Sequence, residues 1–319
     1  EWAQQLIINH KAKHVLILAP LAVSHQTIRE AGKFGIDGVK FCKTKHDMTD
    51  GISITNYEKI EHFEGAEIDA VVLDESSILK SYSGKMKQYI MKRFEKTPFK
   101  LACTATPSPN DHIEILNHSE FLNQLKSSEA LAIWFVNDQS KAGSWALKEH
   151  GKDDFWHWVS SWAVFADNPD SFGDSIPGFN LPNLATKEII FDVDITDCED
   201  ALFRTPVINA TSYHAEKRQT IDRKIEIITD IIKQNPDEIY CVWCETNLES
   251  EKLTKAIPGA IEVKGNDTDT HKETSAIDFV AGKIKVLVSK PSIFGFGLNF
   301  QTCHNVIYCG LSFSYEGYY

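Results

Sequence analysis

The stretch that decides the fold is Ala70-Val71-Val72-Leu73-Asp74-Glu75-Ser76-Ser77, in which a short apolar run ends in two adjacent carboxylates. A short, continuously apolar run is typical of a strand in a parallel sheet that helices cover on both faces. Such sheets bind ligands outside the carboxyl ends of their strands, where Asp74 and Glu75 would lie. An Asp-Glu pair alone is more often a solvated turn, so this segment by itself leaves both interpretations open.

Similar apolar runs recur along the chain and alternate with turn residues and helical patterns. They lie at residues 14–19, 51–55, 99–103, 239–243, 260–263, 284–288 and 306–309. Apolar residues at helical spacing occur between the later runs, for example over 221–232 and 248–257. Strands that alternate with helices predict βαβ units with parallel sheets. The sequence therefore predicts an α/β fold with two units, 1–118 and 186–319.

The residues between these two units, 119–185, have a different pattern. Five of the seven tryptophans lie between about 119 and 180. Apolar side chains recur there at helical spacing: Phe155, Trp158, Val159, Trp162 and Phe165. Such a stripe is usually the packed face of a helix, although base stacking on exposed rings is an alternative. We expect a helical insertion and linker whose tryptophans point inward.

Composition limits the classes of function. The chain has 319 residues, of which 42% are hydrophobic and 24% charged, and at ~100–200 residues per domain this predicts about two globular domains. It contains neither an apolar run of about 18 residues, as a membrane span needs, nor the order of a signal peptide. The net charge of −12 excludes nucleic-acid binding through bulk charge but not through a basic groove. The seven scattered cysteines favour a reducing cytoplasm over secretion.

A second segment strengthens the interpretation of the two carboxylates as a site. The run at 99–103 is followed by Thr104, Thr106 and a proline-stiffened loop that extends to Asp111. Because the carboxyl ends of parallel strands meet at one edge, these threonines should lie near Asp74 and Glu75. In nucleotide-hydrolysing sites of this kind the first acid holds Mg²⁺, usually through water, and the second polarises the attacking water.

These segments resemble a known family. Asp74-Glu75-Ser76-Ser77 followed by Thr104-Ala105-Thr106-Pro107 is similar to motifs II and III of the superfamily-two helicase-like ATPases, the DEAD/DEAH-box-like enzymes. With Ile78-Leu79-Lys80 after the acids, the pattern resembles the Swi/Snf-type DNA translocases, especially the compact kind found in bacteriophage genomes. Residues 18–24 and 54–58 resemble motifs Ia and Ib, whereas 240–243 and 289–300 resemble motifs IV and V. The matches follow the family order over nearly the whole chain.

The resemblance implies two RecA-like lobes that bind ATP and Mg²⁺ between them. It implies that Asp74 holds the metal, that Glu75 activates water, and that Thr104 and Thr106 couple the nucleotide site to a nucleic-acid groove. Nucleotide-binding residues would be Gly295, Gly297 and Asn299. Nucleic-acid contacts would come from Pro20, Ser24, Thr55, Tyr57, Lys80, Ser289, Lys290 and Ser292.

The resemblance implies double-stranded DNA as the partner. These groups offer hydroxyls, backbone N–H groups and lysines to phosphates rather than to base edges, so we expect little sequence specificity. The expected location is the cytoplasm of a prokaryote or of a phage-infected cell.

Blander alternatives stay open for several residues. Tyr57 could be a plain core aromatic, Lys80 a solvated residue at the start of a helix, and the Gly295-Phe296-Gly297 turn a packing feature. His112 and His118 flank a helical pattern, where surface or capping roles are expected. The Cys241-x-x-Cys244 pair has the spacing of zinc ligands, but buried structural thiols are the stronger prediction because no second pair accompanies it.

The sequence also departs from the family pattern. No Gly-Lys pair in it belongs to a phosphate-binding G-x-x-x-x-G-K-[ST] loop, and no Lys or Arg follows Lys290. Residues 1–8 read as the helix that follows such a loop, and residues 313–319 resemble the lead-in to motif VI. We therefore expect a fragment that lacks motifs I and VI, inactive by itself but derived from an ATP-dependent DNA translocase or helicase. The alternative is a nucleic-acid-binding or regulatory module that kept the fold without hydrolysis.

Overall fold

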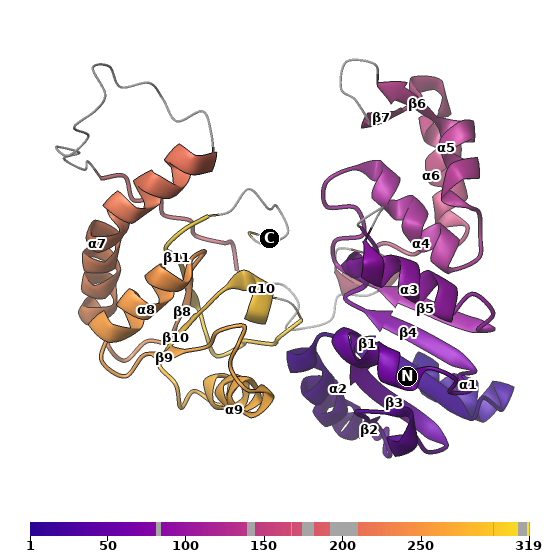
Figure 1. The fold of residues 1–319 in the computed structure, drawn as a ribbon, viewed down its shortest axis with the longest axis horizontal. Coiled ribbons are helices and arrows are strands. Elements are labelled where there is room, and N and C mark those ends of the chain that lie inside the picture. Colours follow the sequence, from indigo (N-terminus) through magenta and orange to yellow (C-terminus); the bar gives the residue numbers. More distant parts are fainter. Residues whose placement is uncertain are drawn as a thin grey trace. The chain divides into compact units, whose positions relative to one another are not determined.

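The first sheet contains five parallel strands, which carry most of the residues singled out by the sequence (Figure 1). The structure, a computed structural model, describes residues 1–80, 84–138, 144–166, 168–173, 182–191, 210–295, 297–311 and 318. The strands are β1 (His14–Ala19), β2 (Lys40–Phe41), β3 (Gly51–Asn56), β4 (Ala70–Asp74) and β5 (Phe99–Cys103). Their order is β2-β3-β1-β4-β5, so β4 lies inside the sheet between β1 and β5.

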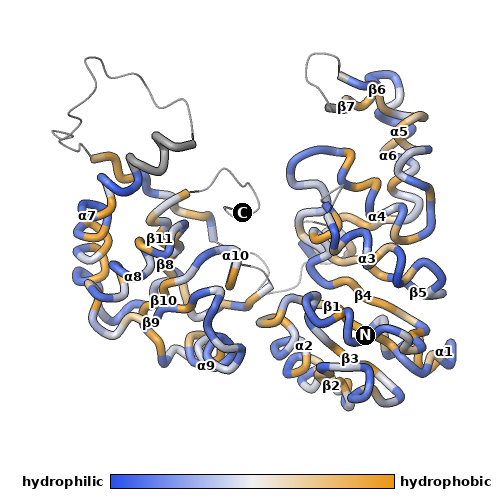
Figure 2. The backbone as a smooth tube through the Cα atoms, in the orientation of Figure 1, coloured by the Kyte–Doolittle hydropathy of each residue, from blue (hydrophilic) through white to orange (hydrophobic). Residues whose placement is uncertain are grey.

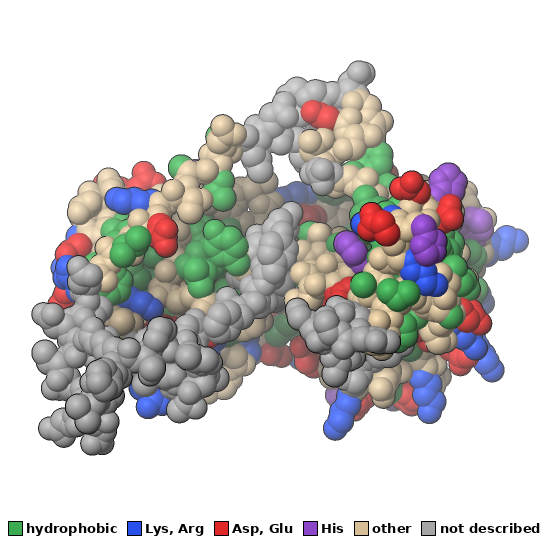
Figure 3. Space-filling view, turned by 90° about the horizontal axis from the view of Figure 1, so that it is seen from above, with side chains coloured by type: hydrophobic (Ala, Val, Ile, Leu, Met, Phe, Trp, Pro, Cys, Tyr) green, Lys and Arg blue, Asp and Glu red, His purple; other side chains and the backbone are tan. Residues whose placement is uncertain are grey.

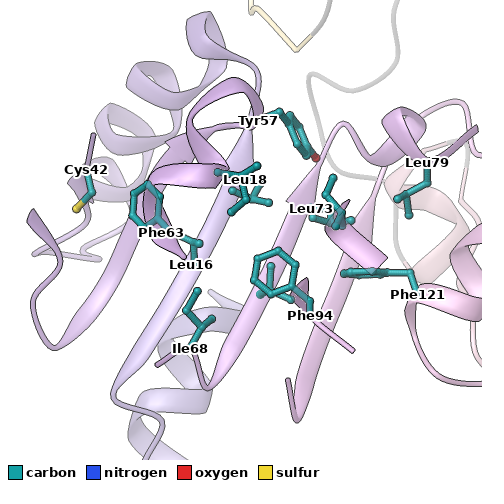
Figure 4. Close-up of a cluster of buried hydrophobic side chains, with 13 residues drawn as sticks. Leu16, Leu18, Cys42, Tyr57, Phe63, Ile68, Leu73, Leu79, Phe94 and Phe121 are labelled. Carbon is teal, nitrogen blue, oxygen red and sulfur yellow. The ribbon is translucent and has the colours of Figure 1, made fainter. Parts of the chain in front are cut away.

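Successive residues of β1 enter different cores because side chains alternate across a strand. Leu16 and Leu18 belong to the core drawn in Figure 4, whereas Val15 packs with Ala3 and Leu6 of the first helix on the other side. The sheet is therefore covered on both faces, as its continuous apolar strands predict. The covering helices are α1 (Trp2–His10), α2 (Leu21–Lys33), α3 (Lys85–Arg93) and α4 (Ile115–Phe121), with the 3₁₀ turns η1 (Lys45–Asp47), η2 (Tyr57–Phe63), η3 (Ser76–Lys80) and η4 (His112–Glu114).

The second sheet has four parallel strands in the order β11-β8-β10-β9. They are β8 (Tyr240–Trp243), β9 (Ile261–Glu262), β10 (Val286–Ser289) and β11 (Asn305–Tyr308), accompanied by α7 (Ala210–Gln234), α8 (Asn247–Ala256), α9 (Asp269–Val280) and α10 (Pro291–Phe294). Side chains again alternate between two cores, one on each face of the sheet. Val242 and Val288 enter one core, and Cys241 and Leu287 enter the other. Each apolar run that the sequence predicts as a strand overlaps one, so the α/β prediction is confirmed.

Hydropathy explains how α7 packs. Ile221, Ile225, Ile228 and Ile232 are its buried residues in the second sheet's core, and their spacing of three or four places them on one helix face. Figure 2 shows the resulting alternation of hydrophobic and hydrophilic residues along the helix. Among the described residues, no helix combines the length and the apolar character that crossing a bilayer requires.

The chain divides into two compact units. One combines residues 1–127 and 214–319, and thus includes both sheets; the other is 128–213. The elements in and next to this second unit are α5 (Ser127–Trp134), β6 (Phe135–Asp138), β7 (Ser144–Leu147), η5 (Glu149–Gly151), α6 (Lys152–Ser160) and η6 (Pro169–Phe172). The first unit extends beyond residue 118, where the sequence suggested that the insertion begins.

The insertion differs from the predicted helical stripe. An antiparallel hairpin of β6 and β7 lies between its helices. The stripe holds only within α6, where Phe155 and Val159 are buried and Trp158 stacks on Trp134 with ring centroids 4.6 Å apart. The helix ends at Ser160, and the hydroxyls of the serines at 160 and 161 donate hydrogen bonds back to helix carbonyls. Phe165 therefore lies outside the helix and is 53% exposed.

Candidate functional site

The two carboxylates lie at the carboxyl end of β4. Asp74 is its last residue and stands in register with Cys103, the last residue of β5. Thr104 therefore follows β5 at the level where Glu75 follows β4, as parallel topology predicts. The Thr104 hydroxyl oxygen accepts a hydrogen bond of 3.1 Å from the backbone N–H of Thr106, which shapes the loop beyond the strand.

The backbone of Glu75 adopts the left-handed conformation, with φ of 55°. A non-glycine residue enters this region only where its surroundings compensate for the steric cost. Here the chain must turn abruptly, because β4 ends at Asp74 and η3 begins at Ser76. Ser76 and Ser77 are buried directly after the turn, so the position of the Glu75 side chain depends on how this following segment is held.

The electrostatics of the pair favour a cation. Burial raises the pKa of Asp74, although a hydrogen bond from the Glu75 backbone opposes this, and the charge of Glu30 adds to the rise. Burial also raises the pKa of Glu75, with a further contribution from the Asp74 charge. No ion pair joins either carboxylate to a basic side chain among the described residues. Two half-buried acids without such a partner form an electronegative site.

This donor set suits Mg²⁺ rather than zinc. Mg²⁺ is usually held by one or two carboxylates, with water and substrate phosphates as its other ligands. In the described part of the chain no group of three or more His, Cys, Asp or Glu side chains could hold a metal ion by itself. Cys241 lies in β8 and Cys244 directly after it, and both are buried, as predicted for structural thiols. Burial raises the pKa of Cys241, and a hydrogen bond with Cys309, together with burial, raises that of Cys244.

Tyr57 holds the carboxyl end of β4 through a hydrogen bond. Its hydroxyl donates a hydrogen bond of 2.7 Å to the backbone carbonyl of Asp74, and its ring is 4% exposed within the core shown in Figure 4. Burial, together with the charges of Asp74 and Glu75, raises its pKa well above the usual value, so the phenol stays protonated and remains a donor. The predicted nucleic-acid contact is not what the structure shows, because the ring faces the core beneath the end of β4.

Three other residues predicted to touch nucleic acid are also buried. The Ser24 hydroxyl donates to the carbonyl of Pro20, the residue before α2, and the Ser289 hydroxyl donates to the carbonyl of Val263. Thr55 is fully buried, and its hydroxyl has no hydrogen-bond partner among the described residues. These side chains point into the layers between sheet and helices, so in this structure they do not reach the surface where nucleic acid would bind.

The remaining predicted contacts are more accessible. Pro20, Lys80 and Lys290 are half-buried and Ser292 is exposed. Lys80 is the last residue of η3, and burial lowers its pKa while Glu114 opposes this shift. On the face shown in Figure 3, acidic and basic side chains are interspersed over the described surface. Any contact with phosphates would therefore be local, as the net charge of the chain already requires.

The predicted nucleotide-binding residues lie in the loop after α10. Gly297 has φ of 65°, and a Cβ atom there would lie 2.6 Å from Val23 Cγ2 and 3.3 Å from Glu75 Oε1. A side chain is thus excluded at this position. The backbone N–H of Asn299 donates to Gln26 Oε1 at 3.0 Å, and Gly295 is exposed. Phe296, and residues 312–317 and 319 of the suggested lead-in to motif VI, lie outside the described residues.

Sequence reasoning missed the residues that hold the segment after the acids. His118, expected at the surface or at a cap, is 5% exposed, and its Nε2 shares a hydrogen bond of 3.0 Å with the Ser76 hydroxyl. Its neighbour Asn117 is fully buried. Every residue from 115 to 119 is buried, so α4 has no polar face in this stretch whose periodicity could have placed these side chains.

Comparison with known proteins bears on the fold. No protein-family model matches the chain, and no curated protein sequence matches it. A Sulfolobus solfataricus SWI2/SNF2 ATPase core in complex with dsDNA is similar over 97% of this chain and 73% of that one, at 14% identity and a TM-score of 0.46. S. cerevisiae Dbp5 bound to RNA and ADP BeF3 is similar over 94% of this chain and 63% of that one, at 15% identity and a TM-score of 0.52.

The inference about the fold rests on the second likeness. Together with the two parallel sheets, it shows a two-lobed, RecA-like α/β fold. The chain spans less than two thirds of the Dbp5 chain, so the activity of a whole protein with this fold is a separate question.

Proposed function

We propose that the protein is an ATP-dependent translocase or helicase core of the Swi/Snf type that moves on double-stranded DNA. The observation that carries the proposal is the pair Asp74 and Glu75 at the carboxyl end of β4, in a RecA-like sheet, with the Thr104 loop following the neighbouring strand. The order of the sequence motifs supports the Swi/Snf type and the compact, phage-like form. The six cysteines in the described part of the chain are free and mostly buried, which agrees with a cytoplasmic location.

The two acids would have different roles. Asp74 would hold Mg²⁺ through water ligands, and the ion when bound supplies positive charge to the phosphate oxygens of ATP. Glu75 would orient the attacking water and accept its proton; burial keeps the Glu75 pKa above its usual value, which makes the carboxylate a better base. Tyr57 would keep the end of β4 in place through its bond to the Asp74 carbonyl.

The other site residues would contact the two ligands at their edges. Gly297 and Asn299 would approach the nucleotide, since the loop that carries them packs against Val23 and Gln26 of α2. Lys290 and Ser292 would contact DNA phosphates, which carry no sequence information. Thr104 and Thr106 would connect the two sites through their loop.

One feature of the sequence favours a second candidate. The 319 residues include no G-x-x-x-x-G-K loop for the β- and γ-phosphates. A module that binds nucleic acid and regulates other proteins without hydrolysing ATP would not need such a loop.

The test compares two matched charge-removing variants of the full-length product of the gene. Glu75→Gln removes the proposed base, whereas Glu67→Gln removes an exposed carboxylate that precedes the amino end of the same strand. We expect ATP hydrolysis stimulated by double-stranded DNA in the wild type and in Glu67→Gln, and none in Glu75→Gln, with ATP and DNA binding retained. Stimulation by RNA only would contradict the choice of nucleic acid. An inactive wild type that binds DNA would support the regulatory module, and an active Glu75→Gln enzyme would show that another carboxylate is the base.

A further inference from the structure

A buried polar cluster joins α4 to η3, the segment that follows the two carboxylates. His118 Nε2 and the Ser76 hydroxyl share a hydrogen bond of 3.0 Å, and both residues are buried. Asn117 Nδ2 donates to the carbonyl of Leu79 at 2.8 Å and also reaches that of Lys80 at 3.3 Å. Two adjacent residues of one short helix thus hold both the beginning and the end of η3.

The same cluster is anchored to a third element. Lys87 Nζ of α3 donates a hydrogen bond of 2.6 Å to Asn117 Oδ1, although the side chain is only 7% exposed. Burying a lysine is unfavourable unless hydrogen bonds compensate for the lost water. Leu79 of η3 and Phe121 of α4 pack in the same apolar core (Figure 4). The orientation of Asn117 is thus set by both α3 and η3.

The cluster acts on the backbone at Glu75. That residue holds the left-handed conformation with φ of 55°, and Ser76 is the next residue along the chain. A strained residue keeps its conformation only where neighbouring contacts determine it. The bond from His118 to Ser76 is the side-chain contact nearest in sequence to Glu75 on its carboxyl side. Loss of that bond would allow the turn to relax and the carboxylate to change direction.

The loop after β5 leads directly into this helix. Asp111 accepts a hydrogen bond of 3.2 Å from the backbone N–H of Ile113 and so caps η4, and α4 begins at Ile115 where η4 ends. The loop that carries Thr104 and Thr106 therefore joins α4 through η4, and α4 in turn contacts η3. The chain provides a continuous connection from the threonines to the carboxylates.

From these contacts we propose that His118 and Asn117 are positioning residues that hold Glu75 for catalysis and couple its orientation to the Thr104 loop. The proposal rests on the proposed function for its consequence, hydrolysis, but its structural part is independent of it. Neither residue touches the reacting groups. They act through Ser76 and the carbonyls of η3.

The first experiment measures amide hydrogen exchange at residues 75–80, with β1 as the internal reference. His118→Leu removes the ring nitrogens, Ser76→Ala removes the partner hydroxyl, and His118→Gln keeps a side-chain group able to bond Ser76. Ser127→Ala is the matched control, because Ser127 is 2% exposed and its hydroxyl bonds the carbonyl of Leu116 and the carboxylate of Glu120, both in α4, and not a residue of η3. Each serine variant removes one buried hydroxyl.

We expect exchange at 75–80 to rise at least tenfold in His118→Leu and in Ser76→Ala, with β1 unchanged. The double variant should exchange no faster than either single one, because both remove the same bond. His118→Gln should remain within threefold of the wild type. Unchanged exchange at 75–80, or the same increase in Ser127→Ala, would refute the positioning role. If His118→Leu does not fold, Ser76→Ala and His118→Gln decide the matter by the same criteria.

The second experiment measures ATP hydrolysis by the full-length product of the gene. His118→Leu should lower kcat at least tenfold with little change in KM for ATP, since Glu75 acts on the attacking water and not on nucleotide binding. A rise in KM with unchanged kcat would contradict this mechanism. If the wild type itself does not hydrolyse ATP, the proposed function fails, while the exchange result still decides whether α4 holds the turn.

Discussion

Stability should depend on pH through His118, and the structure determines both the sign and the size. The imidazole is 5% exposed, and burial lowers its pKa from 6.5 to about 4, an effect that contacts with the backbone at Glu114 and Ser76 partly offset. The charged groups near it are Glu114 and Glu120 on adjacent turns of the chain and Lys87 of α3, which bonds Asn117, and Glu120 also influences the pKa of Lys87. At neutral pH the ring is therefore uncharged in the folded protein.

The unfolded chain takes up this proton at a higher pH than the folded chain does. The histidine therefore does not reduce stability above pH 6.5, and the folded state loses stability as the pH falls from 6.5 towards 4. A difference of about 2.5 pKa units at ~1.36 kcal/mol each gives a full loss of ~3.4 kcal/mol. At pH 5 the loss is about 2 kcal/mol by the same linkage relation.

Urea unfolding followed by tryptophan fluorescence measures this loss. Wild type and His118→Gln are compared at pH 7.5 and pH 5.0, and the free energy of unfolding of the wild type should fall by about 2 kcal/mol more than that of the variant. The raised pKa values of Asp74 and Glu75 act in the opposite direction, because those groups bind protons more readily when folded, but they affect both proteins alike. Equal pH dependence in the two proteins would refute a buried, neutral His118.

Three further outcomes are expected. The 319-residue chain should hydrolyse ATP no faster than background even with DNA, because it has no G-x-x-x-x-G-K loop and no Lys or Arg after Lys290. An arginine finger alone contributes ~10³–10⁵ in rate. A DNA-stimulated rate in a phosphate-release assay would contradict this. Lys290→Ala should weaken DNA binding for all sequences alike and lower the slope of log affinity against log salt by about one, as measured by fluorescence anisotropy. Phe155→Ala should lower the free energy of unfolding of the insertion by ~3–5 kcal/mol in denaturant, because the ring is fully buried among Trp134, Phe135 and Trp158. A change below ~1 kcal/mol would show that the aromatic cluster does not stabilise the insertion.

The sequence by itself determined the strands of the two sheets and the sheet edge at which Asp74 and Glu75 lie. Short apolar runs such as 70–73 have a local signature, and parallel topology then requires Asp74 and Thr104 to lie at the same edge. The hairpin of β6 and β7 escaped prediction because the helical spacing of the aromatic residues at 155–165 was extended to the whole insertion, and the end of α6 depends on serine hydroxyls that bond back to the helix.

The tertiary structure decided which polar side chains serve the site from inside. Ser24, Thr55 and Ser289 resemble surface contacts in the sequence, yet helices and neighbouring strands cover them. His118 looked like a surface residue, yet it bonds Ser76 across 42 positions of the chain. Periodicity reports the face of an element on which a residue lies, but burial depends on elements that are distant in sequence, and no local pattern records them.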